Sequence, residues 1–217
     1  MSRRWPVLPV AAIAAVVASA AACGDPFVPR RAPVYGYADA FGDVFHWPPD
    51  RLPVRFFADP RGSMPSLVAD GVRAWERQFL YGEFRGRLVG DSTAADVIVV
   101  WADSVPPAAE PDPGSPVVAC GGVTQGILDS TGRAFAAPFR IEISILTGTV
   151  FTPAQVQACA HRVVIHELGH SLGVLREAPD TAAIMYAPPR VRQPAPIDRR
   201  TVQVLYHTPA TLAPAPR

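Results

Sequence analysis

Two histidines and a glutamate within residues 166–170, in the order HELGH, are the residues best suited to chemistry. His166 and His170 are four residues apart, so on a helix both imidazoles leave the same face and can bind one metal ion. Glu167 is rotated by roughly 100° from His166 around the helix axis, so it lies beside the ion rather than against it. This pattern is typical of a hydrolytic zinc centre, where the ion lowers the pKa of a bound water from 15.7 to about 7. Glu167 would then take the proton of that water as general base.

One long helix must carry these three residues. Thr152 and Pro153 are typical of a helix start, and we expect the helix to run to about Gly173, which lets the chain turn. Gly169 lies inside this helix and costs about 1 kcal/mol relative to alanine, so we expect close backbone packing there. Apolar residues at helical spacing predict the stripe that faces the core: Val156, Ala160, Val164, Leu168 and Leu172.

The rest of the chain alternates between strand and helix patterns. Residues 96–102 are apolar without alternation, which favours a central parallel strand covered on both faces. Residues 139–145 alternate apolar and polar side chains, which favours a strand with one buried face. The order of elements predicts a mixed α/β layer, α+β in class, with helices packed on a mostly parallel sheet. The predicted elements are strands at 53–58, 84–90, 96–102, 122–129 and 139–145, and helices at 65–80, 153–173 and 198–207, the last with Asp198 as its N-cap.

The N-terminus has the pattern of an export signal. Two arginines precede an apolar run over residues 6–22 that is short for a membrane span and ends in small residues. The run stops at Ala20-Ala21-Ala22-Cys23, which resembles a bacterial lipobox, where the cysteine is lipidated and becomes the first residue. We therefore interpret residues 1–22 as a lipoprotein-type signal peptide, with the protein anchored in the bacterial cell envelope through Cys23. Secretion without a lipid anchor is the alternative.

Length and composition limit the remaining possibilities. The chain has 217 residues, of which 49% are hydrophobic and 18% charged, as in a globular protein with a core. A net charge of +1 gives no argument for binding nucleic acid. We expect residues 23–49 to form a tether and residues 50–207 to form one folded, monomeric domain. Residues 208–217 are proline-rich and are expected to be a disordered tail.

The cysteines predict a disulfide bond. If Cys23 carries lipid, Cys120 and Cys159 remain, and an even pair in an oxidising envelope most simply forms a disulfide. The other possibility is that Cys159 binds the metal. It lies seven residues before His166, which is about 10 Å along a helix and too far for both to bind one ion.

A resemblance to a known family adds to this interpretation. The sequence HELGHSLG, followed by Met185-Tyr186-Ala-Pro, resembles the metzincin zinc metalloproteases, closest to the matrixin branch, over most of residues 50–207. The resemblance implies a metzincin fold and a zinc endopeptidase activity. It places Met185 beneath the zinc ion, in a Met-turn, without binding it. It also implies that an antiparallel edge strand, here residues 122–129, pairs with an extended peptide or protein substrate.

The third zinc ligand departs from the family pattern. The family's third histidine falls on Arg176, and an arginine cannot bind zinc. Counting back from the Met-turn places the ligand at Glu177 instead, and one inserted residue reconciles the two counts. Asp180 is a second candidate, and a site without a third protein ligand is the remaining possibility.

Two functions therefore stay open. The first is a zinc-dependent endopeptidase with Glu167 as general base and His166, His170 and Glu177 as metal ligands. The second is an inactive relative that serves as a binding module in the envelope. The retained Glu167 favours the enzyme, whereas a cation at Arg176 beside the metal would favour the inactive protein.

Overall fold

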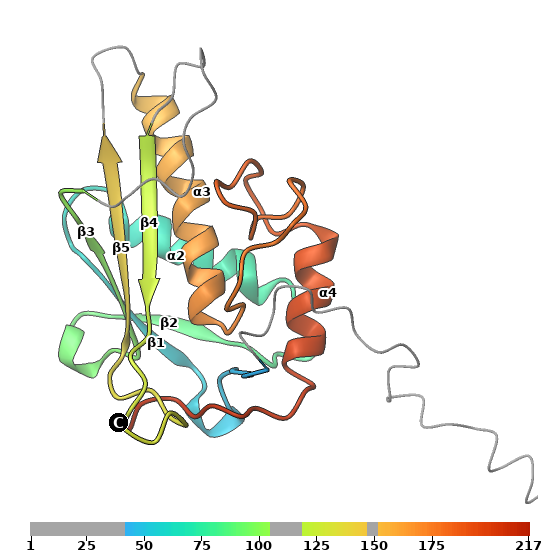
Figure 1. The fold of residues 1–217 in the computed structure, drawn as a ribbon. Coiled ribbons are helices and arrows are strands. Elements are labelled where there is room, and N and C mark those ends of the chain that lie inside the picture. Colours follow the sequence, from blue (N-terminus) through green and yellow to red (C-terminus); the bar gives the residue numbers. More distant parts are fainter. Residues whose placement is uncertain (1–41, 105–118, 147–151) are drawn as a thin grey trace, which may run out of the picture. The chain divides into compact units, whose positions relative to one another are not determined.

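A five-stranded sheet forms the centre of the fold in the computed structural model, which describes residues 42–104, 119–146 and 152–217 (Figure 1). The strands lie in the order β2-β1-β3-β5-β4, with parallel pairing except between β5 and β4, which are antiparallel. The sheet therefore confirms the predicted mixed α/β arrangement with an antiparallel strand at one edge. The bounds are β1 Val54–Ala58, β2 Gly86–Val89, β3 Val97–Trp101, β4 Ala119–Gln125 and β5 Phe139–Leu146.

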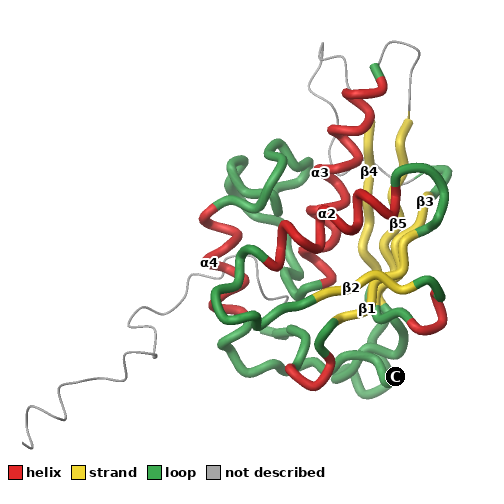
Figure 2. Tube along the Cα trace, turned by 180° about the vertical axis from the view of Figure 1, so that it is seen from behind, coloured by secondary structure: helices red, strands yellow, loops and turns green. Residues whose placement is uncertain are grey.

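Two helices, α2 (Met64–Glu76) and α3 (Pro153–Ser171), lie side by side on one face of this sheet (Figure 1, Figure 2). Helix α2 packs on β1, β2 and β3, whereas α3 packs on β4 and β5. The indole of Trp75 on α2 donates a hydrogen bond of 2.8 Å to the carbonyl of Ile165 and so joins the two helices. The core fills the space between helices and sheet, and its largest buried side chains include Trp75, Phe56, Leu67, Ile141, Ile143, Ile165 and Leu168.

Helix α3 begins where the sequence predicts. The side chain of Thr152 accepts a hydrogen bond from the backbone of Gln155, and the Gln155 side chain accepts one from the backbone of Thr152. This capping box satisfies two backbone donors that the first turn of a helix leaves unpaired. The remaining helices are α4 (Pro196–Leu205) and two short 3-10 turns, η1 (Pro49–Arg51) and η2 (Ser92–Ala94).

Strand β3 differs from the prediction of a strand covered on both faces. Val97 and Val99 are fully buried beneath the helices, but Ile98 and Val100 are only half-buried. The reason is that α2 and α3 both pack on the same side, so the described residues cover the opposite face only in part.

Several predicted element ends are wrong by a few residues. Helix α2 ends at Glu76 rather than at residue 80, because Gln78 bonds to the carbonyl of Trp75, three residues back, and breaks the helical pattern. Strand β4 ends at Gln125 rather than at residue 129. Beyond it the carboxylate of Asp129 accepts backbone hydrogen bonds that form a turn.

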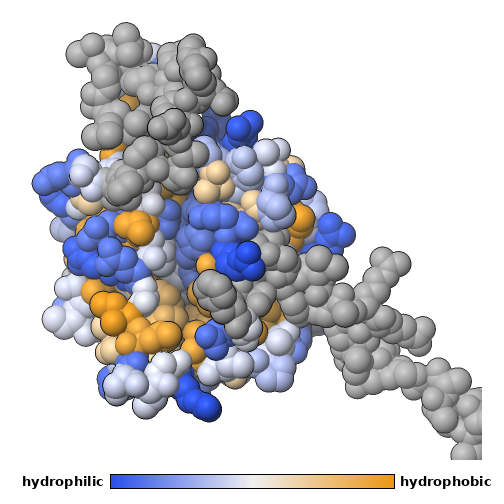
Figure 3. Space-filling model, viewed as in Figure 1, coloured by the Kyte–Doolittle hydropathy of each residue, from blue (hydrophilic) through white to orange (hydrophobic). Residues whose placement is uncertain are grey.

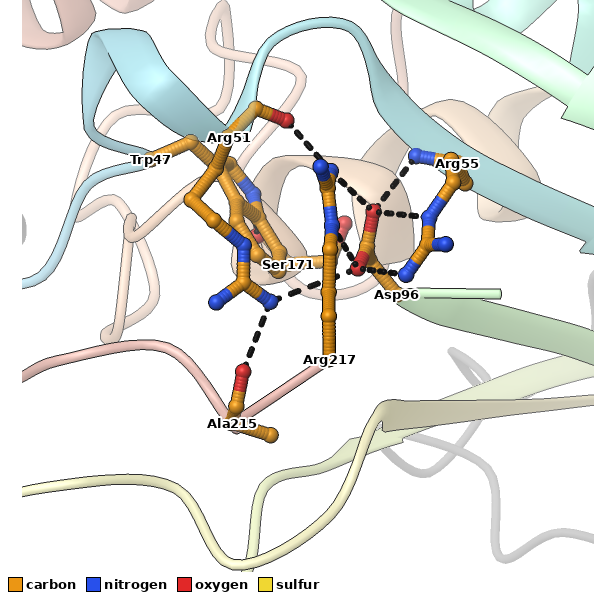
Figure 4. Close-up of polar contacts among 7 residues, drawn as sticks. All are labelled: Trp47, Arg51, Arg55, Asp96, Ser171, Ala215 and Arg217. Carbon is orange, nitrogen blue, oxygen red and sulfur yellow. Dashed lines mark hydrogen bonds and ion pairs between the residues drawn. The ribbon is translucent and has the colours of Figure 1, made fainter. Parts of the chain in front are cut away.

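The folded domain begins earlier than predicted. Phe45 and Trp47, which fall within the predicted tether, are buried in the core. The Trp47 indole donates a hydrogen bond of 2.9 Å to the carbonyl of Ser171, at the end of α3 (Figure 4). Phe45 and Trp47 are therefore core residues rather than part of a tether. The predicted signal peptide, residues 1–22, and the predicted lipidation site Cys23 lie outside the described residues.

The C-terminal segment also belongs to the fold, in contrast to the predicted disordered tail. Leu212 is buried, and the guanidinium group of Arg217 bonds to both carboxylate oxygens of Asp96, at 3.2 and 3.0 Å (Figure 4). Arg51 and Arg55 bind the same carboxylate. Burial and a shared ion pair hold this segment without regular secondary structure.

Asp96 is the centre of this charge cluster, with a side chain that is only 3% exposed. Burial raises the pKa of Asp96, but the hydrogen bonds from Arg55 and Arg217 outweigh that effect and hold the pKa below its ordinary value of 3.8. A carboxyl group with a lowered pKa stabilises the folded state above its unfolded pKa, and that stabilisation is lost as the pH falls through the folded value.

We expect Asp96→Asn to lower the free energy of unfolding by about 3 kcal/mol at pH 7, because it leaves three arginines without their buried partner. The loss should shrink as the pH falls below about 4, since the carboxyl group of the original protein is then being protonated. Urea denaturation at several pH values measures both effects. Asp70→Asn is the matched control, because Asp70 pairs with Arg73 on the exposed face of α2 and should cost less than about 0.5 kcal/mol. Equal losses for both variants would contradict the assigned role of Asp96.

None of the helices within the described ranges has both the length and the apolar character that a membrane span requires.

Candidate functional site

Three side chains converge at the C-terminal end of α3. The Nε2 atoms of His166 and His170 are 3.2 Å apart. One carboxylate oxygen of Glu177 lies 3.4 Å from Nε2 of His166, and the other lies 3.4 Å from Nε2 of His170. In a tetrahedral zinc site with bonds of about 2.0–2.1 Å, neighbouring ligand atoms are roughly 3.3–3.4 Å apart. The three side chains therefore have the spacing of a set of metal ligands, and they could hold one ion.

Backbone carbonyl groups fix the orientation of both imidazoles. Nδ1 of His166 lies 2.8 Å from the carbonyl oxygen of Ile184, and Nδ1 of His170 lies 2.6 Å from that of Val174. Because a carbonyl oxygen can only accept, each Nδ1 carries the proton and donates it. Each Nε2 then presents its lone pair toward the shared space, which is the tautomer that a metal ligand needs.

A tight turn after α3 brings Glu177 back to the histidines. Gly173 has a φ angle of +108°, and a Cβ atom there would lie 1.9 Å from the carbonyl oxygen of Phe45. Only glycine fits this position, both for its backbone conformation and for its space. The backbone of Ala178 then donates a 2.7 Å hydrogen bond to the carbonyl of Met185, which holds the segment in place directly after Glu177.

The electrostatics of the site suit a cation. Burial raises the pKa of Glu177, but hydrogen bonds and charge from His166 and His170 outweigh this and lower the pKa to about 2. Burial lowers the pKa of His170, but its hydrogen bond to Glu177 and the charges of Glu167 and Glu177 raise the pKa above its ordinary value. Glu177 is therefore ionised at neutral pH, with half of its side chain exposed to solvent.

Asp180, the second candidate for the third ligand, and Arg176, where the family's third histidine would fall, both lie outside this group of side chains. Asp180 is exposed, and its carboxylate accepts a hydrogen bond of 2.9 Å from the backbone of Ala182. Asp180 is not one of the three residues that could together hold an ion. Arg176 is also exposed to solvent rather than enclosed with the histidines. Of the residues considered from the sequence, Glu177 is the one that the fold brings to the two histidines.

Glu167 lies on the same helix and faces strand β4. Its side chain is buried, and Oε2 accepts a hydrogen bond of 2.7 Å from the hydroxyl of Thr124. A Cβ atom at Gly122 would lie 2.6 Å from Oε1 of Glu167. The absence of a side chain at Gly122 therefore lets the carboxylate approach the edge strand.

Met185 packs against α3 at Gly169. A Cβ atom at Gly169 would lie 2.3 Å from the sulfur of Met185 and 2.7 Å from the indole of Trp75. This contact explains the glycine inside the helix. Met185 is fully buried.

Asp198 holds the same turn from the side of α4. It lies in the first turn of that helix rather than at the predicted N-cap position. Its buried carboxylate accepts hydrogen bonds from the backbone of Ala195, Ile184 and Met185. Burial raises the pKa of Asp198 despite these donors. Because Ile184 in turn accepts from His166, Asp198 supports the ligand indirectly.

A cleft of about 340 Å³ opens between β4 and the metal-binding residues. His166, Glu167, His170 and Glu177 line part of this cleft. The cleft is lined on its remaining sides by Gly122, Val123, Thr124, Gly126, Phe135, Phe139 and Leu175. The predicted edge strand therefore forms one wall, although its regular part ends at Gln125.

Sequence reasoning missed several residues of this cleft. Thr124 and Gly122 fall inside the predicted edge strand, and their spacing of two places them on one face. That signal was available, but it did not indicate which side of the strand faces the helix. Phe135 and Phe139 were not singled out by any sequence pattern, and they are buried in the core as well as lining the cleft.

The predicted disulfide is present. Cys120 on β4 is bonded to Cys159 on α3, with 6.0 Å between the Cα atoms. The bond joins the edge strand β4 to α3. Because its sulfur atom is part of the disulfide, Cys159 is not a metal ligand.

Comparison with protein-family models matches no family, and comparison with curated proteins finds no similar chain.

We expect Glu177→Ala to weaken zinc binding by roughly a hundredfold or more, because even residues that only support a ligand are worth 10–100-fold. Competition with a chromophoric chelator measures the affinity without any need for activity. Asp180→Ala is the matched control, since it removes a nearby carboxylate that caps a turn. A loss of affinity in Asp180→Ala, with Glu177→Ala unchanged, would reverse the ligand assignment.

Proposed function

We propose that this protein is a zinc-dependent endopeptidase of the metzincin type. The observation that carries the proposal is the convergence of two imidazole Nε2 atoms and the Glu177 carboxylate at the ligand spacing of tetrahedral zinc. Two histidines and one carboxylate form a known class of catalytic zinc site that leaves a fourth position open. The site fits zinc better than magnesium or calcium, because those ions prefer ligand sets made of oxygen atoms.

The position of Glu167 supports a hydrolytic role. A zinc ion bound there would make a water molecule acidic enough to react at neutral pH and would polarise a substrate carbonyl. Glu167 follows His166 in the sequence, but it is not one of the three residues that could together hold the ion. It would accept the proton of the attacking water and pass it to the leaving amine. A protein that only held a metal ion would have no use for a buried carboxylate at this point.

The edge strand supports a peptide as substrate. Among the described strands, β4 has a single neighbour, β5, so its other edge has unpaired backbone groups available. An extended peptide could pair with these groups while its scissile bond lies beside Glu167. The apolar lining of the cleft would receive a nearby side chain of the peptide. This lining includes Phe135, Phe139 and Leu175.

The alternative of an inactive binding module has lost its main argument. That argument was a cation placed against the metal by Arg176, whereas the side chain of Arg176 is exposed. Glu177, rather than Arg176, lies with the two histidines, so Arg176 no longer argues against a bound cation.

We expect Glu167→Ala to lower the rate of peptide hydrolysis by about 10²–10⁴-fold, because the general base is lost while the ligands remain. Hydrolysis of fluorescein-labelled casein measures activity, and plasma mass spectrometry measures zinc content, which should stay near one ion per chain.

Glu142→Ala is the matched control, because Glu142 pairs with Arg140 on β5, away from the ligands. A Glu167→Ala protein that retained the activity of the original would refute the general-base role. A zinc-loaded original protein without any hydrolysis of unfolded protein substrates would refute the proposed function itself.

A further inference from the structure

Three contacts in a row join strand β4 to helix α3. On the strand, every second residue from 120 to 124 faces the helix, and on the helix every fourth residue from 159 to 167 faces the strand. Two residues of a strand rise by about 6.6–6.8 Å, and four residues of a helix rise by about 6.0 Å. The two rises are similar, so the strand and the helix stay in register over three successive contacts, which we call steps. We call this row the β4–α3 seam, and it consists of Cys120, Gly122 and Thr124 on β4 and Cys159, Val163 and Glu167 on α3.

Each step of the seam uses a different kind of contact. The first is the covalent bond between Cys120 and Cys159. The second is a close approach at Gly122, where a Cβ atom would lie 2.6 Å from Val163 and 2.6 Å from Glu167. No larger residue fits there without moving the strand away from the helix.

The third step is polar and ends at the candidate general base. The hydroxyl oxygen of Thr124 lies 2.7 Å from Oε2 of Glu167 and 3.0 Å from the carbonyl oxygen of the same residue. A hydroxyl group has one proton, and the shorter of the two distances assigns that proton to the carboxylate of Glu167. Thr124 therefore fixes one oxygen of Glu167 and leaves Oε1 beside Gly122.

We propose that the β4–α3 seam positions Glu167 against the edge strand, with Thr124 and the Cys120–Cys159 disulfide as its positioning residues. This inference rests on the proposed function, in which β4 binds the substrate backbone and Glu167 is the general base. In that setting, any shift of β4 along α3 changes the distance between the scissile bond and Glu167. A displacement of about 1 Å can lower a rate by about a hundredfold.

The first test compares Thr124→Val with Thr124→Ser in the zinc-loaded full chain. Thr124→Val keeps the shape but removes the donor, so kcat should fall roughly ten- to a hundredfold while KM changes by less than about twofold. Thr124→Ser retains the hydroxyl and should restore kcat to within about threefold of the original. Thr93→Val is the control, since it removes an exposed hydroxyl bond to Asp91 in a distant turn.

The second test removes the covalent step. Cys120→Ala/Cys159→Ala should lower kcat more than it changes KM, with zinc content unchanged, when assayed well below its unfolding temperature. A serine variant as inactive as the valine variant, or changes confined to KM, would overturn the positioning role. So would a disulfide-free variant with the original kcat.

A third measurement separates this inference from the proposed function. Thr124→Val and Glu167→Ala are combined in a double-mutant cycle, and the urea midpoint is measured for each variant. A non-additive shift supports the Thr124–Glu167 contact even if the original protein hydrolyses no peptide, in which case only the proposed function fails. Additive shifts together with unchanged kcat in Thr124→Val would overturn the seam while the proposed function stands.

Discussion

The contact between the Glu177 carboxylate and the Nε2 atoms of His166 and His170 is the interaction on which the site depends. Two histidines four residues apart on a helix supply only two ligands, and a third must come from another segment. A carboxylate held by two imidazoles is also already ionised, as its pKa of about 2 indicates. Much of the surrounding structure serves to bring the Glu177 side chain to the two histidines.

Several contacts behind the site support Glu177 and the two imidazoles. Gly173 turns the chain sharply against Phe45, so residues from the predicted tether become part of the support for the metal ligands. Ile184 and Val174 hold the imidazoles through their carbonyl groups, and Asp198 in turn holds Ile184. Each ligand is therefore fixed by a partner that does not itself touch the ion.

The sequence predicted the parts of this arrangement that depend on local spacing. The helical spacing of His166 and His170 and the capped start of their helix follow from neighbouring residues. Gly169 indicated close packing, but not that its partners would be Met185 and Trp75. The choice between Glu177 and Asp180 did not, because it depends on how the turn after Gly173 is supported by distant segments. The contacts of Thr124 with Glu167 and of Arg217 with Asp96 join residues 43 and 121 positions apart, so no local pattern could predict them. The C-terminal segment was misjudged for the same reason, since its order comes from an ion pair and buried side chains rather than from regular structure.

The central claim is that His166, His170 and Glu177 together bind one zinc ion. The most direct test is a crystal structure of the zinc-loaded chain with anomalous diffraction measured on both sides of the zinc absorption edge. The account predicts one zinc peak with both Nε2 atoms and one Glu177 oxygen within about 2.2 Å of the ion. A zinc ion bound elsewhere, or bound to the two histidines with the Glu177 carboxylate turned away, would contradict it.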